Sequence, residues 1–223
     1  MLKIDFIIII SIQFIIIMSL EIEKRFKNFD YKTLKKLFEK YNIQKNGGYL
    51  FNVTSYIPLK ENQIIRTRNE GNKITFTIKE KTNTYDKEWE VNVSDQIMMN
   101  NMLQLLGIEK FREIYKDDNN ELVFDHYPGL YPYLEIESNT EENLLKMMGN
   151  LNLESENKFN AKDLYYLEYG ISKERPDKDL TFDNALEMFD SFITKNKDKF
   201  IKIINHQQDF IKKYSNKKNT LIN

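Results

Sequence analysis

The chain has 223 residues, 41% of them hydrophobic, and its 33 basic and 34 acidic side chains leave a net charge of −1. This near-neutral balance argues against a general nucleic-acid binder, whose domain is normally basic. Cysteine is absent and only two histidines occur, which excludes disulfides, thiolate metal sites and a histidine-rich zinc site. Any metal must be held by oxygen ligands, which favours Mg²⁺, Mn²⁺ or Ca²⁺.

The amino terminus is strongly apolar, because Ile4 to Met18 consists almost entirely of isoleucine and phenylalanine. A membrane-spanning helix needs roughly 20 apolar residues, so this run is short. It also lacks the small-residue cleavage site of a signal peptide. We interpret residues 1–17 as an upstream extension that is not part of the native product, in preference to a membrane anchor. We therefore expect a cytoplasmic protein without a membrane partner.

The predicted elements begin with a strand over 20–27 and a helix over 31–41. Asp30 stands at the N-cap position of this helix, and apolar residues recur within it at helical spacing. Turns are predicted at Asn46-Gly47-Gly48 and at 69–72. The strands of this region are expected at 49–57, 62–69, 73–81 and 86–93.

The second half of the chain begins with a helix predicted over 96–106, capped by Asp95 and ended by Gly107. Its apolar stripe consists of Ile97, Met98, Met102, Leu105 and Leu106. Three further strands are predicted at 110–116, 121–126 and 132–138. The remaining helices are predicted at 140–148, 161–169 and 182–213.

Short connections between successive strands imply antiparallel pairing, and eight strands are enough to close around side chains or a small ligand. The predicted fold class is α+β: an eight-stranded antiparallel β-tunnel, a closed or nearly closed barrel, with a charged lumen and helices packed outside. The expected domains are a tunnel domain over 18–180 and a C-terminal helical extension over 181–223.

The predicted strands carry charged side chains on one face and apolar side chains on the other. Side chains alternate along a strand, so Glu21, Glu23 and Arg25 share one face while Ile22 and Phe26 share the opposite face. In a single strand such a face is most simply a solvated one. Several strands repeat the pattern, however, and their apolar faces need covering by helices. The charged faces should then line the interior.

An interior with so many charges is costly unless the charges pair or bind something. A divalent metal would remove this cost for the carboxylates, and a triphosphate would do so for the basic groups, since arginine grips phosphate oxygens in a bidentate manner. The carboxylates are Glu21, Glu23, Glu135 and Glu137. The basic groups are Arg25, Arg66, Arg68, Lys79 and Arg112.

The ordered set of motifs resembles the CYTH superfamily of triphosphate tunnel metalloenzymes, which includes class IV adenylate cyclases and thiamine triphosphatases. Glu21-x-Glu23-x-Arg25 is similar to the ExExK signature of that superfamily, with arginine in place of lysine. The further matches, which together cover about 20–180, are Arg66-Thr67-Arg68, Thr75 to Lys79, Glu88-Trp89-Glu90, Lys110-Phe111-Arg112, Phe124-Asp125, Pro132 to Glu137, and Leu164 to Ile171.

The resemblance implies a role for each charged position. The implied ligands of Mg²⁺ or Mn²⁺ are Glu21, Glu23, Asp125, Glu135 and Glu137. The implied phosphate-binding residues are Arg25, Arg66, Arg68, Lys79, Lys110 and Arg112. Glu88 and Glu90 are candidates for orienting the basic groups or a water molecule. His126 follows Asp125 on the opposite face of its strand, so a catalytic role is not expected of it.

The expected activity is metal-dependent hydrolysis of an inorganic or organic triphosphate. The alternatives are a class IV type adenylate cyclase, an RNA 5′-triphosphatase, and a non-catalytic polyphosphate- or nucleotide-binding protein. The triphosphate end of an RNA is the one nucleic-acid partner that this interpretation leaves open. Cyclisation and hydrolysis differ in whether a ribose hydroxyl or water attacks the phosphorus, and no single residue of the sequence decides between them.

Overall fold

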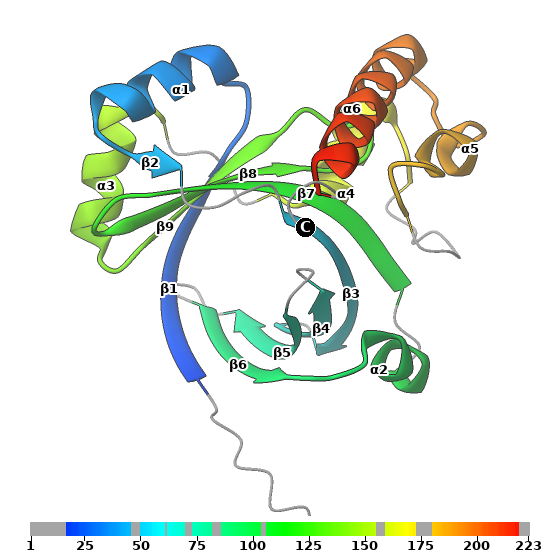
Figure 1. The fold of residues 1–223 in the computed structure, drawn as a ribbon, viewed down its shortest axis with the longest axis horizontal. Helices are drawn as coiled ribbons and strands as arrows, with labels where there is room; N and C mark the ends of the chain where they lie inside the picture. Colours follow the sequence, from blue (N-terminus) through cyan, green and yellow to red (C-terminus); the bar gives the residue numbers. More distant parts are fainter. Residues whose placement is uncertain are drawn as a thin grey trace, which may run out of the picture.

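The computed structural model of the chain describes residues 17–45, 50–60, 62–69, 73–81, 86–103, 106–154, 159–172 and 180–218. In this part of the chain, antiparallel strands curve around a common centre and helices lie on their outer side (Figure 1). The predicted α+β class is confirmed. Residues 1–16 of the predicted extension, and most of both predicted turns, lie outside the described residues.

The strands pair in an order that returns to its start. They are β1 (Ile17–Phe26), β2 (Gln44–Lys45), β3 (Leu50–Lys60), β4 (Gln63–Asn69), β5 (Ile74–Lys81), β6 (Asp86–Asn92), β7 (Leu106–Lys116), β8 (Asn120–His126) and β9 (Tyr133–Ser138). Their order is β2-β7-β3-β4-β5-β6-β1-β9-β8, and β7 also pairs with β8. Each pairing is antiparallel. Strands β1 and β3 to β9 are therefore connected as a ring.

Most of the helices form two neighbouring groups over the outer side of β7, β8 and β9, and α2 (Gln96–Leu103) lies apart from both (Figure 1). The other helices are α1 (Tyr31–Lys40), α3 (Glu141–Asn150), α4 (Ala161–Tyr169), α5 (Ala185–Phe189) and α6 (Lys197–Lys218). One group is α1 and α3, which bury Phe38 and Leu144 against Phe124 and Leu134 of the strands. The other group, α4 to α6, packs on β7 and the β8–β9 loop around Tyr169, Phe200 and Ile204. The two cores cover separate parts of the outer side of the ring.

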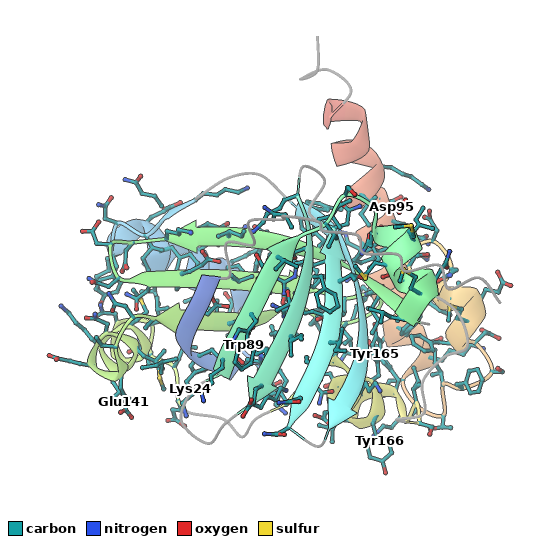
Figure 2. All side chains as sticks on the ribbon, turned by 90° about the horizontal axis from the view of Figure 1, so that it is seen from below. Lys24, Trp89, Asp95, Glu141, Tyr165 and Tyr166 are labelled. Atoms are coloured by element: carbon teal, nitrogen blue, oxygen red, sulfur yellow. The ribbon has the colours of Figure 1, made fainter. Side chains whose placement is uncertain are left out.

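Helix caps follow the sequence signals closely. Asp30 accepts a hydrogen bond from the backbone N–H of Thr33 (2.6 Å), as its predicted N-cap position requires. Asp95 likewise accepts from the N–H of Met98 (2.9 Å) at the start of α2, beside the strands (Figure 2). Among the described residues, no helix combines the length and the apolar character that crossing a bilayer demands.

The helix predicted over 96–106 is too long at its carboxyl end. Helix α2 stops at Leu103 and β7 starts at Leu106, four residues earlier than the strand predicted at 110. The reason is long-range pairing, since Gly107 pairs with Ser55 of β3 and is held in an extended backbone. Ile97 and Met102 of the predicted apolar stripe are 74% and 72% exposed, so the stripe is not a buried face.

The helix predicted over 182–213 is also wrong in its continuity, because α5 and α6 are separate helices. Asn196 lies between them with φ of 55°, a left-handed conformation that interrupts a right-handed helix and that asparagine tolerates. Its side chain donates to the carbonyl oxygen of Glu168 (2.7 Å), which attaches this corner to α4.

The outer apolar faces are covered unevenly, although helices were expected over all of them. Ile136 is fully buried beneath α1 and α3, whereas Phe76, Ile78 and Trp89 on the outer faces of β5 and β6 are only half-buried. Figure 2 looks onto these strands, with Trp89 labelled. Here α2 lies against β4. The side-chain amide of Gln96 donates a hydrogen bond to the hydroxyl of the buried Thr67, and this hydroxyl donates to the side-chain oxygen of Asn100.

Candidate functional site

Alternate side chains of the ring point inwards and line a cavity of about 470 Å³. Every predicted site residue whose side chain the structure describes lines this cavity. They are Glu23, Arg25, Arg66, Arg68, Lys79, Glu88, Glu90, Lys110, Arg112, Asp125, Glu135 and Glu137. The structure describes only the backbone of Glu21, which lies in β1 opposite Asp86 of β6. The ring thus gathers acidic and basic side chains from distant parts of the chain.

Three carboxylates form an acidic cluster, which consists of Glu23, Glu135 and Glu137. One oxygen of each lies within 4.8 Å of the others, the spacing at which a single cation could be held. The register explains the cluster, because Glu23 pairs directly with Glu137 across β1 and β9, and Glu135 lies opposite Arg25. Cross-strand partners project on the same face of a sheet.

Burial and the nearby Glu135 carboxylate raise the pKa of Glu23 to about 7, despite the opposing effect of Arg25. Burial alone would also raise the pKa of Glu135, but the attraction of Arg25 and Arg112 outweighs it and holds this pKa well below its usual range. The two carboxyls therefore share a site in which one carries the negative charge and the other readily takes up a proton.

Arg25 connects the acidic cluster to the polypeptide outside the ring. Its guanidinium donates to Glu135 (2.9 and 3.1 Å), to Glu23 (3.1 Å) and to the carbonyl oxygen of Phe159 (3.3 Å). These donors are directed at carboxylates and a backbone oxygen, although the sequence places Arg25 among the phosphate-binding residues. In the structure Arg25 is the counter-ion of the acidic cluster.

Asp125 is fully buried and is bound by two basic residues of β7. It accepts from Lys110 (2.8 Å) and from two nitrogens of Arg112 (2.8 and 2.9 Å). Burial would raise the pKa of Asp125, but attraction by Arg112 and Lys110 outweighs burial and lowers it. Burial, helped by Arg112, lowers the pKa of Lys110 to about 7. Asp125 thus fixes two cations and is not one of the three clustered carboxylates.

Glu88 bridges two basic residues on the opposite wall. It accepts from Arg66 (2.9 Å) and forms a salt bridge with Lys79 (2.7 Å). Glu90 accepts from Lys73 (2.7 Å) and from the hydroxyl of Thr77 (3.4 Å). Glu88 therefore fixes the positions of basic groups, which is one of the two tasks expected of it.

Several lining residues were not anticipated. Tyr127 and Tyr133 stack on one another with ring centroids 5.8 Å apart, and Asn160 precedes α4 at the edge of the cavity. Tyr133 could have been found, since it alternates with Glu135 and Glu137 along β9. Asn160 lies at the N-cap of α4 and lines the cavity because of the way in which α4 packs on the strands, which the sequence of the helix does not reveal.

The sequence matches no protein-family model, and no curated protein is similar enough to match it. Solved structures do resemble it. Protein PH1012 of Pyrococcus horikoshii OT3 is 24% identical, with a TM-score of 0.54 over 62% of this chain and 96% of that one. A Bacillus halodurans protein provisionally named an adenylate cyclase is 17% identical, with a TM-score of 0.50 over 67% and 98%.

A third structure, from Vibrio parahaemolyticus and also provisionally named an adenylate cyclase, is 12% identical, with a TM-score of 0.55 over 66% of this chain and 98% of that one. The chain shares the fold of these three structures. The resemblance drawn from the motifs is thereby confirmed as a likeness of fold, and it spans nearly the whole length of each of these neighbours.

Proposed function

We propose that the chain hydrolyses a triphosphate inside the ring of strands, which serves as a tunnel for the substrate, with the help of Mg²⁺ or Mn²⁺. The observation that carries the proposal is the charge arrangement of the 470 Å³ cavity. The acidic cluster lies on β1 and β9, and Arg66 and Arg68 extend from β4, across the ring from it. A metal-bound triphosphate has the complementary charges.

The residues present fit a divalent cation. Glu23, Glu135 and Glu137 supply oxygen ligands only, which suits Mg²⁺ or Mn²⁺. The raised pKa of Glu23 reflects negative charges held close together in a buried place, and a divalent cation would relieve that repulsion. When bound, such an ion supplies Lewis-acid polarisation of phosphoryl oxygens and a more acidic water.

The basic residues would bind and orient the triphosphate. Glu88 keeps Arg66 and Lys79 in fixed positions, and Asp125 does so for Lys110 and Arg112. Preorganised cations lose little freedom when an anion binds. The buried Nε of Arg66 has no hydrogen-bond acceptor among the described residues, so a donor remains for a phosphate oxygen.

A second candidate is the cyclisation of ATP to cyclic AMP and pyrophosphate, since two proteins of the same fold carry the name adenylate cyclase. This reaction would use the same basic side chains to hold the triphosphate of ATP. The reactions differ in their products, because hydrolysis at the terminal phosphorus releases phosphate and cyclisation releases pyrophosphate.

One experiment tests both candidates. The purified chain is incubated with tripolyphosphate, thiamine triphosphate, ATP and triphosphate-ended RNA, each with Mg²⁺ and with Mn²⁺, and phosphate and pyrophosphate are quantified separately. We expect phosphate from at least one substrate and none without metal. Pyrophosphate with cyclic AMP from ATP would establish the cyclase instead. Tight binding of tripolyphosphate without any product would identify a non-catalytic binder and overturn the proposal.

A further inference from the structure

A second cavity, of about 500 Å³, lies outside the ring between α1 and α6. Its floor is the outer face of β7 and β8, where Phe111, Glu113 and His126 alternate with the inward-facing Arg112 and Asp125. Figure 1 shows α1 to the left and α6 to the right above the outer side of these strands. The volume falls within the roughly 300–1,000 Å³ typical of small-molecule sites.

The walls of this outer cavity are mainly apolar and rich in rings. Ile203, Phe210 and Ile211 recur along one face of α6, and the Phe210 ring meets Phe111 edge-on at 5.0 Å. Phe182 adds a ring from the segment before α5. Aromatic faces and edges favour stacking with a flat aromatic ligand over an aliphatic chain of equal size.

One end of the outer cavity carries an organised polar group. The buried Glu113 accepts hydrogen bonds from Tyr31, Lys35 (2.8 Å), Tyr115 (3.0 Å) and His126 (3.1 Å). Four donors occupy the acceptor sites of the carboxylate, so Glu113 itself has little capacity left for a ligand. Its effect is to hold the Lys35 ammonium and the His126 ring at this end of the cavity.

The charge of the lining favours an anion. The lining contains two lysines, Lys35 and Lys202, and one carboxylate, Glu113, which leaves a surplus of one positive charge when both histidines, His126 and His206, are counted as neutral. Lys35 has three N–H bonds and gives one to Glu113, and Lys202 on α6 is exposed at the rim.

We propose that the outer cavity is a binding site for a small aromatic organic anion. Its ring system lies against Phe111, Phe210 and Ile203, and its carboxylate or sulfonate is attracted by the surplus positive charge that Lys35 and Lys202 give the lining. The site is separate from the triphosphate cavity, and its occupation requires no catalytic activity.

The test uses two fluorescent probes of nearly equal shape, anilinonaphthalene sulfonate and the uncharged N-phenylnaphthylamine. We expect one sulfonate probe to bind per chain, also in the presence of saturating tripolyphosphate with Mg²⁺. Ile203→Phe narrows the cavity and should abolish binding of both probes. Ile201→Phe, on the same helix but away from the cavity, should leave both unchanged.

A second variant tests the charge without touching the packed wall. Lys202→Met should weaken sulfonate binding by up to about fivefold, as expected for an exposed charge pair, and leave the uncharged probe unaffected. Lys212→Met, an exposed lysine of the same helix, is the control. Undiminished sulfonate binding to a folded Ile203→Phe chain would overturn the proposal, as would competitive displacement of the probe by tripolyphosphate.

Discussion

At the scale of single residues, the cavity inside the ring depends on carboxylates that differ in their partners. Asp125 is neutralised by two cations, and Glu88 by two others, whereas Glu23 has a raised pKa within the acidic cluster. Carboxylates therefore fix basic groups at two places and form an acidic cluster at a third.

The first prediction concerns Glu23. Glu23→Gln should lower the turnover of triphosphate by about a hundredfold or more, because loss of a group that merely supports a metal ligand already costs roughly 10–100-fold. It should also weaken the binding of Mn²⁺, measured by isothermal titration. Glu142→Gln, on the exposed side of α3, serves as the control. Near-native turnover of Glu23→Gln at saturating Mg²⁺ would show that the metal assignment is wrong.

The second prediction concerns the basic wall. Arg68→Ala should raise the KM for tripolyphosphate roughly tenfold to a hundredfold, since one charge-assisted contact is worth about 1.5–3 kcal/mol. Mn²⁺ binding should change little, because β4 lies across the ring from the acidic cluster. Lys24→Ala removes a cation from the exposed outer side of β1 and should leave KM unaltered. Steady-state kinetics of the three chains compare these effects, and an unchanged KM in Arg68→Ala would contradict the assignment.

At the scale of elements, Glu113 joins α1 to β7 and β8. Burial would raise the pKa of Glu113, but hydrogen bonds from His126, Lys35 and Tyr31 outweigh burial and lower it to about 2. A lowered pKa means that the folded state favours the charged carboxylate. The stabilisation is therefore complete above the ordinary value near 4.5 and is lost as the pH falls towards 2.

The third prediction follows from the lowered pKa of Glu113. Glu113→Gln should reduce the free energy of unfolding by about 3 kcal/mol at pH 7, and the difference from the unaltered chain should shrink between pH 4.5 and pH 2. Urea unfolding at several pH values measures it, with Glu142→Gln as the control. A difference that does not vary with pH would mean that Glu113 stabilises the fold by packing alone.

The fourth prediction compares two glycines. At Gly129, whose φ is +75°, an added Cβ would lie 2.1 Å from the buried Phe200 ring of α6, while at Gly149 in α3 nothing lies within 4 Å. Gly129→Ala should cost about 3 kcal/mol or more through strain and overpacking. Gly149→Ala should stabilise by about 0.5–1 kcal/mol. Thermal unfolding of both variants tests whether the β8–β9 turn positions α6, and equal effects would refute it.

At the scale of the whole molecule, the cavity inside the ring exists only when all strands of the ring are paired. A ligand that binds this cavity should therefore stabilise the folded chain and not the unfolded one. The fifth prediction is that tripolyphosphate with Mg²⁺, at a hundred times its Kd, adds about 2.7 kcal/mol to the stability and raises Tm by several degrees. Orthophosphate should give a much smaller shift, and an equal shift would mean that the ring does not recognise the chain of three phosphates.

Much of the architecture could be predicted because the strand signal is local. Side chains alternate with a period of two, so the sequence alone places Glu23 with Arg25, Arg66 with Arg68, and Glu135 on the charged faces of their strands. The boundaries at Leu103 and Leu106 could not be predicted. There, pairing with β3 decides that the chain is extended, against a sequence that would continue a helix.

The sequence by itself determined which side chains face the interior and that this interior is charged, since both follow from residue type and alternation. Only the tertiary structure decided which charges meet. Glu23 and Glu135 come together, and Asp125 meets Lys110 and Arg112, through strand register around the ring. Register is set by long-range packing and hydrogen bonding, so partners and pKa values depend on contacts that no local pattern encodes.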